Sequence, residues 1–107
     1  ISHIYLLKET SMKLVVLYRH PADVSAFEAA YAAHLKLVDA IPNTQGYTIT
    51  RFNRTLGGEN LYLMFELHFA DRDAMKAAMN SAAMAAVGVD ARRFGAETIS
   101  MALGAEQ

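Results

Sequence analysis

The chain has 107 residues, of which 53% are hydrophobic and 20% charged, and its formal net charge at pH 7 is −1. This indicates one globular domain with enough apolar side chains for a two-layer core. Cysteine is absent, which excludes disulfides and a thiol nucleophile and fits a cytoplasmic location. No basic stripe could follow a phosphate backbone, which argues against a nucleic-acid partner. No apolar run approaches the roughly 20 residues that cross a bilayer, which argues against a membrane.

The first eleven residues differ from the rest of the chain. They begin without Met and carry no small-residue cleavage site of the kind that ends a signal peptide. A domain-like pattern starts at Met12. We interpret residues 1–11 as an N-terminal extension or a cloning remnant, and residues 12–107 as a single domain. The apolar character of the extension predicts that it packs on something where it is ordered.

The first half of the domain predicts a strand followed by a helix. Residues 14–19 are apolar on both faces and β-branched in the middle, which is typical of a central strand. Apolar residues then recur at steps of three and four, which predicts a helix over 23–40. Asp23 is the expected N-cap, and Ser25 with Glu28 offers an alternative capping register.

Alternating apolar and polar residues predict three further strands, over 47–52, 61–69 and 97–103. Between the last two, Asp71 is expected to cap a second helix, which Asn80-Ser81 interrupts. A short further helix is expected to end at Gly88.

The order β-α-β-β-α-β predicts a ferredoxin-like sandwich of the α+β class, an antiparallel sheet with both helices on one face. Right-handed crossovers place the first and third strands at the centre of this sheet. The predicted helix-side residues are Leu61, Leu63, Phe65, Leu67, Ile49, Ile99 and Met101. The predicted residues of the other face are Tyr62, Met64, Glu66, His68, Thr48, Thr50, Phe52, Thr98 and Ser100. This second face is mixed in polarity, so it could meet a second subunit and close a barrel, or line a small-molecule cavity.

His34 is the most informative single residue. It shares or flanks the apolar stripe of its helix, which includes Tyr31 and Val38. A titratable group that points toward a core needs a partner or a purpose. Two readings follow: a histidine satisfied by a backbone carbonyl or a carboxylate, or a polar anchor in a ligand pocket.

Glu66 and His68 form a second candidate site. Two residues apart on one strand, they share a face at a spacing of about 7 Å, within reach of one ligand or one proton relay. They could also be a buried polar pair that stabilises a dimer. The chain's histidines lack the usual metal-ligand spacings, so we expect no metal site. No glycine-rich phosphate loop or dinucleotide motif is present, so we expect no cofactor.

Several short motifs follow one another along the domain, and their order is more specific than any one of them. They are Lys13-Leu14-Val15-Val16-Leu17-Tyr18-Arg19, His34-Leu35-Lys36-Leu37 with Ile41-Pro42, Tyr47-Thr48-Ile49-Thr50-Arg51 and Tyr62-Leu63-Met64-Phe65-Glu66-Leu67-His68-Phe69. Over about residues 12–106, this series resembles the EthD family, which is named for the ethyl tert-butyl ether degradation cluster. The family's helix usually reads His-x-Pro-Leu; here Lys36 replaces the proline, which would let the helix continue another turn.

The resemblance implies a small, usually cofactor-free protein that forms a homodimer through its sheets, a dimeric α+β barrel. Relatives with this barrel include monooxygenases and lactone isomerases. We therefore expect a protein that binds, and as an enzyme would transform, a small apolar oxygenated or aromatic metabolite in a degradative or oxidative pathway, as an oxidoreductase or isomerase. The alternatives are a non-enzymatic accessory or metabolite-binding protein, with an oxygenase-system partner, and a purely structural dimer. The predicted catalytic residues are His34, Glu66 and His68, and the predicted substrate-binding residues are Tyr18, Tyr31, Thr48, Met64 and Ser100.

Overall fold

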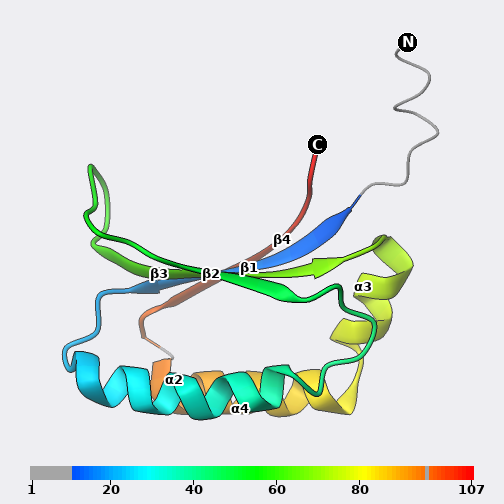
Figure 1. The fold of residues 1–107 in the computed structure, drawn as a ribbon, viewed down its shortest axis with the longest axis horizontal. Coiled ribbons are helices and arrows are strands. Elements are labelled where there is room, and N and C mark those ends of the chain that lie inside the picture. Colours follow the sequence, from blue (N-terminus) through cyan, green and yellow to red (C-terminus); the bar gives the residue numbers. More distant parts are fainter. Residues whose placement is uncertain (1–10, 96) are drawn as a thin grey trace.

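The structure, a computed structural model, describes residues 11–95 and 97–107. The predicted N-terminal extension therefore lies almost wholly outside the described residues. The elements in chain order are β1 (Met12–Arg19), α2 (Val24–Val38), β2 (Tyr47–Arg51), β3 (Leu61–Phe69), α3 (Arg72–Met79), α4 (Ala82–Gly95) and β4 (Ile99–Ala105). Figure 1 shows two layers, with the sheet on one side and α2 and α4 side by side on the other.

The four strands form one antiparallel sheet in the order β2-β3-β1-β4. The predicted α+β ferredoxin-like fold is thus confirmed, and so are the central places of the first and third strands. Across residues 11–95 and 97–107, none of the helices combines the length and the hydropathy of a membrane-spanning helix.

The first helix begins where the sequence predicts. The Asp23 side chain accepts a hydrogen bond from the Ala26 backbone N–H at 3.0 Å, so Asp23 is the N-cap and the alternative register is not used. The helix continues through Lys36 to Val38, as expected for a lysine in place of proline.

The last helix is longer than predicted. It starts after Ser81, whose hydroxyl accepts a hydrogen bond from the Met84 backbone N–H at 3.1 Å, and it runs through Gly88 to Gly95. The prediction that this helix ends at Gly88 is therefore wrong. An interior glycine costs a helix only about 1 kcal/mol, and burial of Met84 and Phe94 against the core offsets this. The last strand starts two residues later than predicted, at Ile99.

The core lies between the sheet and the helical layer. Its members on the sheet include the predicted Leu63, Phe65 and Leu67 of β3 and alternate residues of β1, and α2 contributes Phe27, Tyr31 and Val38. Tyr62 departs from the predicted alternation. Tyr18 and Arg19 of β1 face Leu63 and Leu61, so Tyr62 is the extra residue of a β-bulge. Its ring lies 5.4 Å from that of Phe27, on the helix side, which corrects its placement on the other face.

Candidate active site

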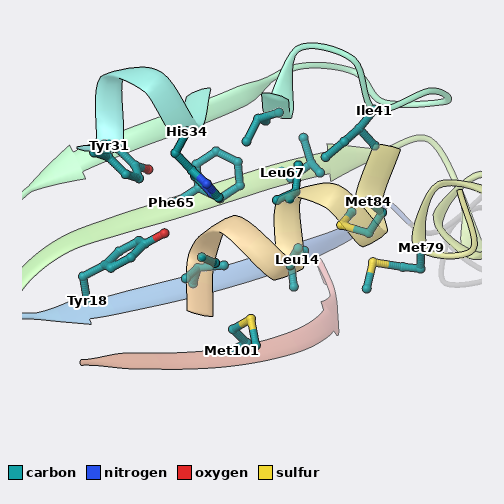
Figure 2. A pocket seen from close by; sticks show the side chains of 15 residues that line it. Leu14, Tyr18, Tyr31, His34, Ile41, Phe65, Leu67, Met79, Met84 and Met101 are labelled. Atoms are coloured by element: carbon teal, nitrogen blue, oxygen red, sulfur yellow. The ribbon is translucent and has the colours of Figure 1, made fainter. Parts of the chain in front are cut away.

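A cavity of about 180 Å³ lies between the sheet and the helices. Figure 2 shows side chains from β1, α2, β3, α4 and β4 around it. Most of its walls are apolar, formed for example by Leu14, Val38, Leu67 and Met84. Met101 lines it from the edge strand and is 65% exposed, so the cavity approaches the surface there. For comparison, an apolar cavity of about 150 Å³ in another protein binds benzene, so this one has room for a small aromatic molecule.

Three of the predicted site residues lie together at one end of this cavity. Tyr18 comes from β1, and Tyr31 and His34 come from α2, one helical turn apart. The Tyr31 ring centroid lies 5.4 Å from that of Tyr18 and 6.0 Å from that of His34. Figure 2 shows both hydroxyl groups and the imidazole turned toward the same region. We call these three residues the polar end of the cavity.

His34 is paired with a buried carboxylate. Its Nδ1 lies 2.8 Å from Oδ2 of Asp90, and the two residues are only 4% and 9% exposed. An ionised carboxylate can only accept hydrogen bonds, so Nδ1 carries the proton of this hydrogen bond, and Nε2 is the ring nitrogen that Asp90 does not engage. The two readings of His34 are therefore not exclusive, because the ring is satisfied by a carboxylate on one side and lines the cavity as well.

Asp90 is held by a second partner. Its Oδ1 accepts a hydrogen bond from Nε of Arg93 at 3.2 Å and another from the Arg93 Nη2. The Arg93 guanidinium and the His34 ring both hold the pKa of Asp90 below its ordinary value. Asp90 is therefore ionised at neutral pH, with its negative charge next to His34.

Sequence reasoning missed Asp90. Asp90 lies three residues after Val87 and four before Phe94, on the inner side of α4. This helical spacing would have predicted that Asp90 faces the core, provided that the helix was known to continue past Gly88. Ending the predicted helix at Gly88 placed Asp90 outside the helix and concealed this signal.

The two tyrosines keep their protons in this setting. Tyr18 is 2% exposed and Tyr31 is 1% exposed. Burial raises the pKa of each phenol well above its ordinary value of 10, and neighbouring negative or phenolic groups add to the rise. Among the described residues, the Tyr31 hydroxyl has no hydrogen-bond partner. Both side chains are therefore neutral donors at the polar end.

The other five predicted site residues lie on the sheet face away from the helices, which we call the open face. Glu66 accepts a hydrogen bond from Lys13 at 2.8 Å, which lowers the pKa of Glu66. The Thr48 hydroxyl lies 3.4 Å from Glu66 Oε1 and 3.3 Å from His68 Nε2, so these three residues meet as a cluster. Met64 and Ser100 flank Leu17 on the same face. In residues 11–95 and 97–107, no three metal-ligating side chains gather closely enough to hold a metal ion.

The fold and the polar end together define an α+β sandwich protein with a largely apolar cavity between its two layers. No protein-family model matches the chain, and no curated protein matches it significantly. An ethyl tert-butyl ether degradation (EthD) family protein from Bacillus halodurans C-125 is 30% identical, with a TM-score of 0.84, and the match covers 91% of this chain and 99% of that one. The chain belongs to the EthD family.

More distant structures share the fold. A dimeric ferredoxin-like protein of unknown function from Thermobifida fusca YX is 17% identical, with a TM-score of 0.68 and coverage of 92% of both chains. A cofactor-independent oxygenase from Streptomyces nogalater is also 17% identical, with a TM-score of 0.62 and coverage of 92% of this chain and 94% of that one. At these identities, the matches show the architecture alone.

Proposed function

We propose that this protein binds a small apolar oxygenated molecule in the cavity and that His34 acts on it as a general base. One observation carries the proposal: an imidazole that a buried carboxylate holds at Nδ1 lines a cavity with otherwise largely apolar walls. Such a base oriented by a carboxylate is the usual arrangement for proton abstraction. That a cofactor-independent oxygenase shares the fold supports the proposal at the level of architecture.

The chemistry would follow from the His34–Asp90 pair. Nε2 takes a proton from an acidic O–H or C–H bond of the bound molecule, and the electron pair of that bond stays on the ligand as an anion. Asp90 stabilises the imidazolium that forms, and the apolar walls keep out water that would compete for the proton. Return of the proton to another atom would complete an isomerisation. Reaction of the anion with dioxygen would begin an oxygenation without a cofactor.

Isotope exchange tests this directly. We expect the protein to speed the exchange of the acidic C–H hydrogens of phenylacetone for deuterium in D₂O, followed by NMR. His34→Gln should lower this rate about 100-fold or more, since general-base catalysis contributes factors of about 10² to 10⁴. The matched control is His20→Gln, because the His20 ring is exposed and packs on Tyr62 at 5.2 Å, outside the cavity. Equal rates for wild type and His34→Gln would contradict the proposal, and binding without exchange would favour the non-enzymatic alternative.

We also propose that two copies meet through the open face. Its centre carries the apolar side chains of Val15, Leu17 and Met64, and the Lys13–Glu66 ion pair neutralises charge beside them. Contact with a second copy would remove the apolar side chains of this face from water, which favours a symmetric dimer. The existence of dimeric ferredoxin-like proteins of this architecture supports the proposal. The cluster of Glu66, His68 and Thr48 would then lie inside the interface, and its catalytic role stays a prediction.

A further inference from the structure

We infer that the ligand is a small apolar carbonyl compound, a ketone or an aldehyde with an acidic C–H bond beside its C=O group, and that Tyr18 and Tyr31 donate hydrogen bonds to its oxygen. This inference rests on the proposed function, because it assigns the ligand of the same cavity. It adds the chemical class of that ligand and the roles of the two tyrosines.

The unpartnered hydroxyl of Tyr31 is the first observation. Tyr31 lines the cavity, is 1% exposed, and its hydroxyl has no hydrogen-bond partner among the described residues. A buried donor without an acceptor is unfavourable and uncommon in folded proteins. An acceptor oxygen on a bound molecule would satisfy it.

Tyr18 supplies a second donor at the same place. Its ring meets that of Tyr31 edge to face at 5.4 Å, and Figure 2 shows its hydroxyl turned toward the same region as the His34 ring. A carbonyl oxygen has two lone pairs, so it can accept from both phenols at once. Burial keeps both phenols protonated, so they donate across the physiological pH range.

Two donors next to a base favour a carbonyl over other oxygenated groups. When Nε2 of His34 removes the proton, the C–H bond breaks, a carbon–carbon double bond forms, and the C=O π electron pair moves to oxygen. The negative charge then develops at the atom that both tyrosines contact, so their hydrogen bonds strengthen in the transition state. An ether offers no such acidic hydrogen. A carboxylate would bring a second negative charge close to Asp90, whose Oδ2 is 2.8 Å from the His34 ring.

Two probes of nearly equal shape test the inference. Acetophenone and α-methylstyrene differ only in a C=O group against a C=CH₂ group, so the ratio of their dissociation constants isolates the oxygen. We expect Tyr31→Phe and Tyr18→Phe each to weaken acetophenone binding about fivefold, the equivalent of one hydrogen bond. The dissociation constant of α-methylstyrene should stay within about twofold of its wild-type value in both variants, which would also show that the cavity of each variant is intact.

Tyr47→Phe is the matched control. The Tyr47 ring packs on Phe65 at 5.2 Å and does not line the cavity, so this variant should leave the ratio at the wild-type value. A ratio in Tyr31→Phe equal to that of wild type would overturn the inference and leave the role of His34 standing. Failure of both probes to bind the wild-type protein at millimolar concentration would overturn the proposed function together with the inference.

Discussion

At the scale of single residues, the polar end combines groups that are costly to bury. Asp90 is charged at 9% exposure, and the Tyr31 hydroxyl is buried without a partner. A core selected for stability alone would carry apolar side chains at such positions. Their presence around one cavity is the physical reason to place function here.

Asp90 should make stability depend on pH in the acid range. The pKa of Asp90 is lower in the folded protein than its ordinary value of 3.8. The contribution of Asp90 to the free energy of unfolding is therefore present when the pH is above that ordinary value, and it is lost as the pH falls toward the lowered pKa of the folded state. Asp90→Asn should lower the free energy of unfolding at pH 7 by about 1–3 kcal/mol, since a buried hydrogen-bonded charge is removed. Urea unfolding at a series of pH values measures both effects. An unchanged acid dependence in Asp90→Asn would show that other carboxylates dominate it.

Tyr31→Phe should raise the stability of the ligand-free protein. The substitution removes a buried hydroxyl that has no partner among the described residues, and the ring stays in the core. We expect the free energy of unfolding to rise by about 1 kcal/mol, the lower end of the usual cost of an unsatisfied buried donor. Thermal unfolding of Tyr31→Phe and of Tyr47→Phe, compared with wild type, measures this. A loss of stability in Tyr31→Phe would mean that its hydroxyl is already satisfied.

At the scale of elements, α2 and α4 bring the site together. The first supplies His34 and the second supplies Asp90, 56 residues later, and the two helices pack side by side over the sheet (Figure 1). Gly88 lies within α4, one turn before Arg92 and just ahead of Asp90. The continuity of the helix across Gly88 therefore sets where Asp90 points.

Gly88→Ala should stabilise α4. A Cβ atom at this position would meet only the Arg92 Nη1, at an ordinary contact distance of 3.7 Å, so no clash opposes the change. Alanine in a helix interior is favoured over glycine by about 1 kcal/mol, which raises the melting temperature by roughly 4–8 °C in a domain of this size. Ala85→Gly, at an exposed position of the same helix, should have the opposite effect. Differential scanning calorimetry of both variants checks this, and a lower melting temperature for Gly88→Ala would refute it.

The elements also show what could be predicted from the sequence. Alternation identified β3 to the residue, and Asp23 and Asp71 were correct N-caps, because both signals are local. The end of α4 was missed because tertiary packing outweighs the local preference of Gly88. The β-bulge at Tyr62 could not be predicted, because it does not change the alternation of apolar and polar residues along β3.

The candidate site could be predicted only in part. Three of the eight predicted site residues line the cavity, and five lie on the open face. The alternation of side chains along a strand does not indicate which face of the sheet holds a cavity.

At the scale of the whole molecule, the two faces of the sheet have different surroundings. The helix side is covered by α2 and α4 (Figure 1). The cavity lies on this side, between the sheet and the helices. The open face has no covering layer within the described part of the chain. The cavity and the open face thus lie on opposite sides of the sheet.

Leu17→Arg should separate the proposed dimer. Leu17 lies at the centre of the open face, between Met64 and Ser100, so a buried unpaired charge would oppose association by several kcal/mol. Sedimentation velocity at micromolar concentration should give the wild type a mass twice the 11.8 kDa of one chain, and Leu17→Arg the mass of one. The control is Leu37→Arg on α2, a residue 38% exposed that does not line the cavity. If Leu37→Arg dissociates the protein and Leu17→Arg does not, the contact lies on the helical side. Acetophenone binding by monomeric Leu17→Arg would show in addition that the cavity works within a single chain.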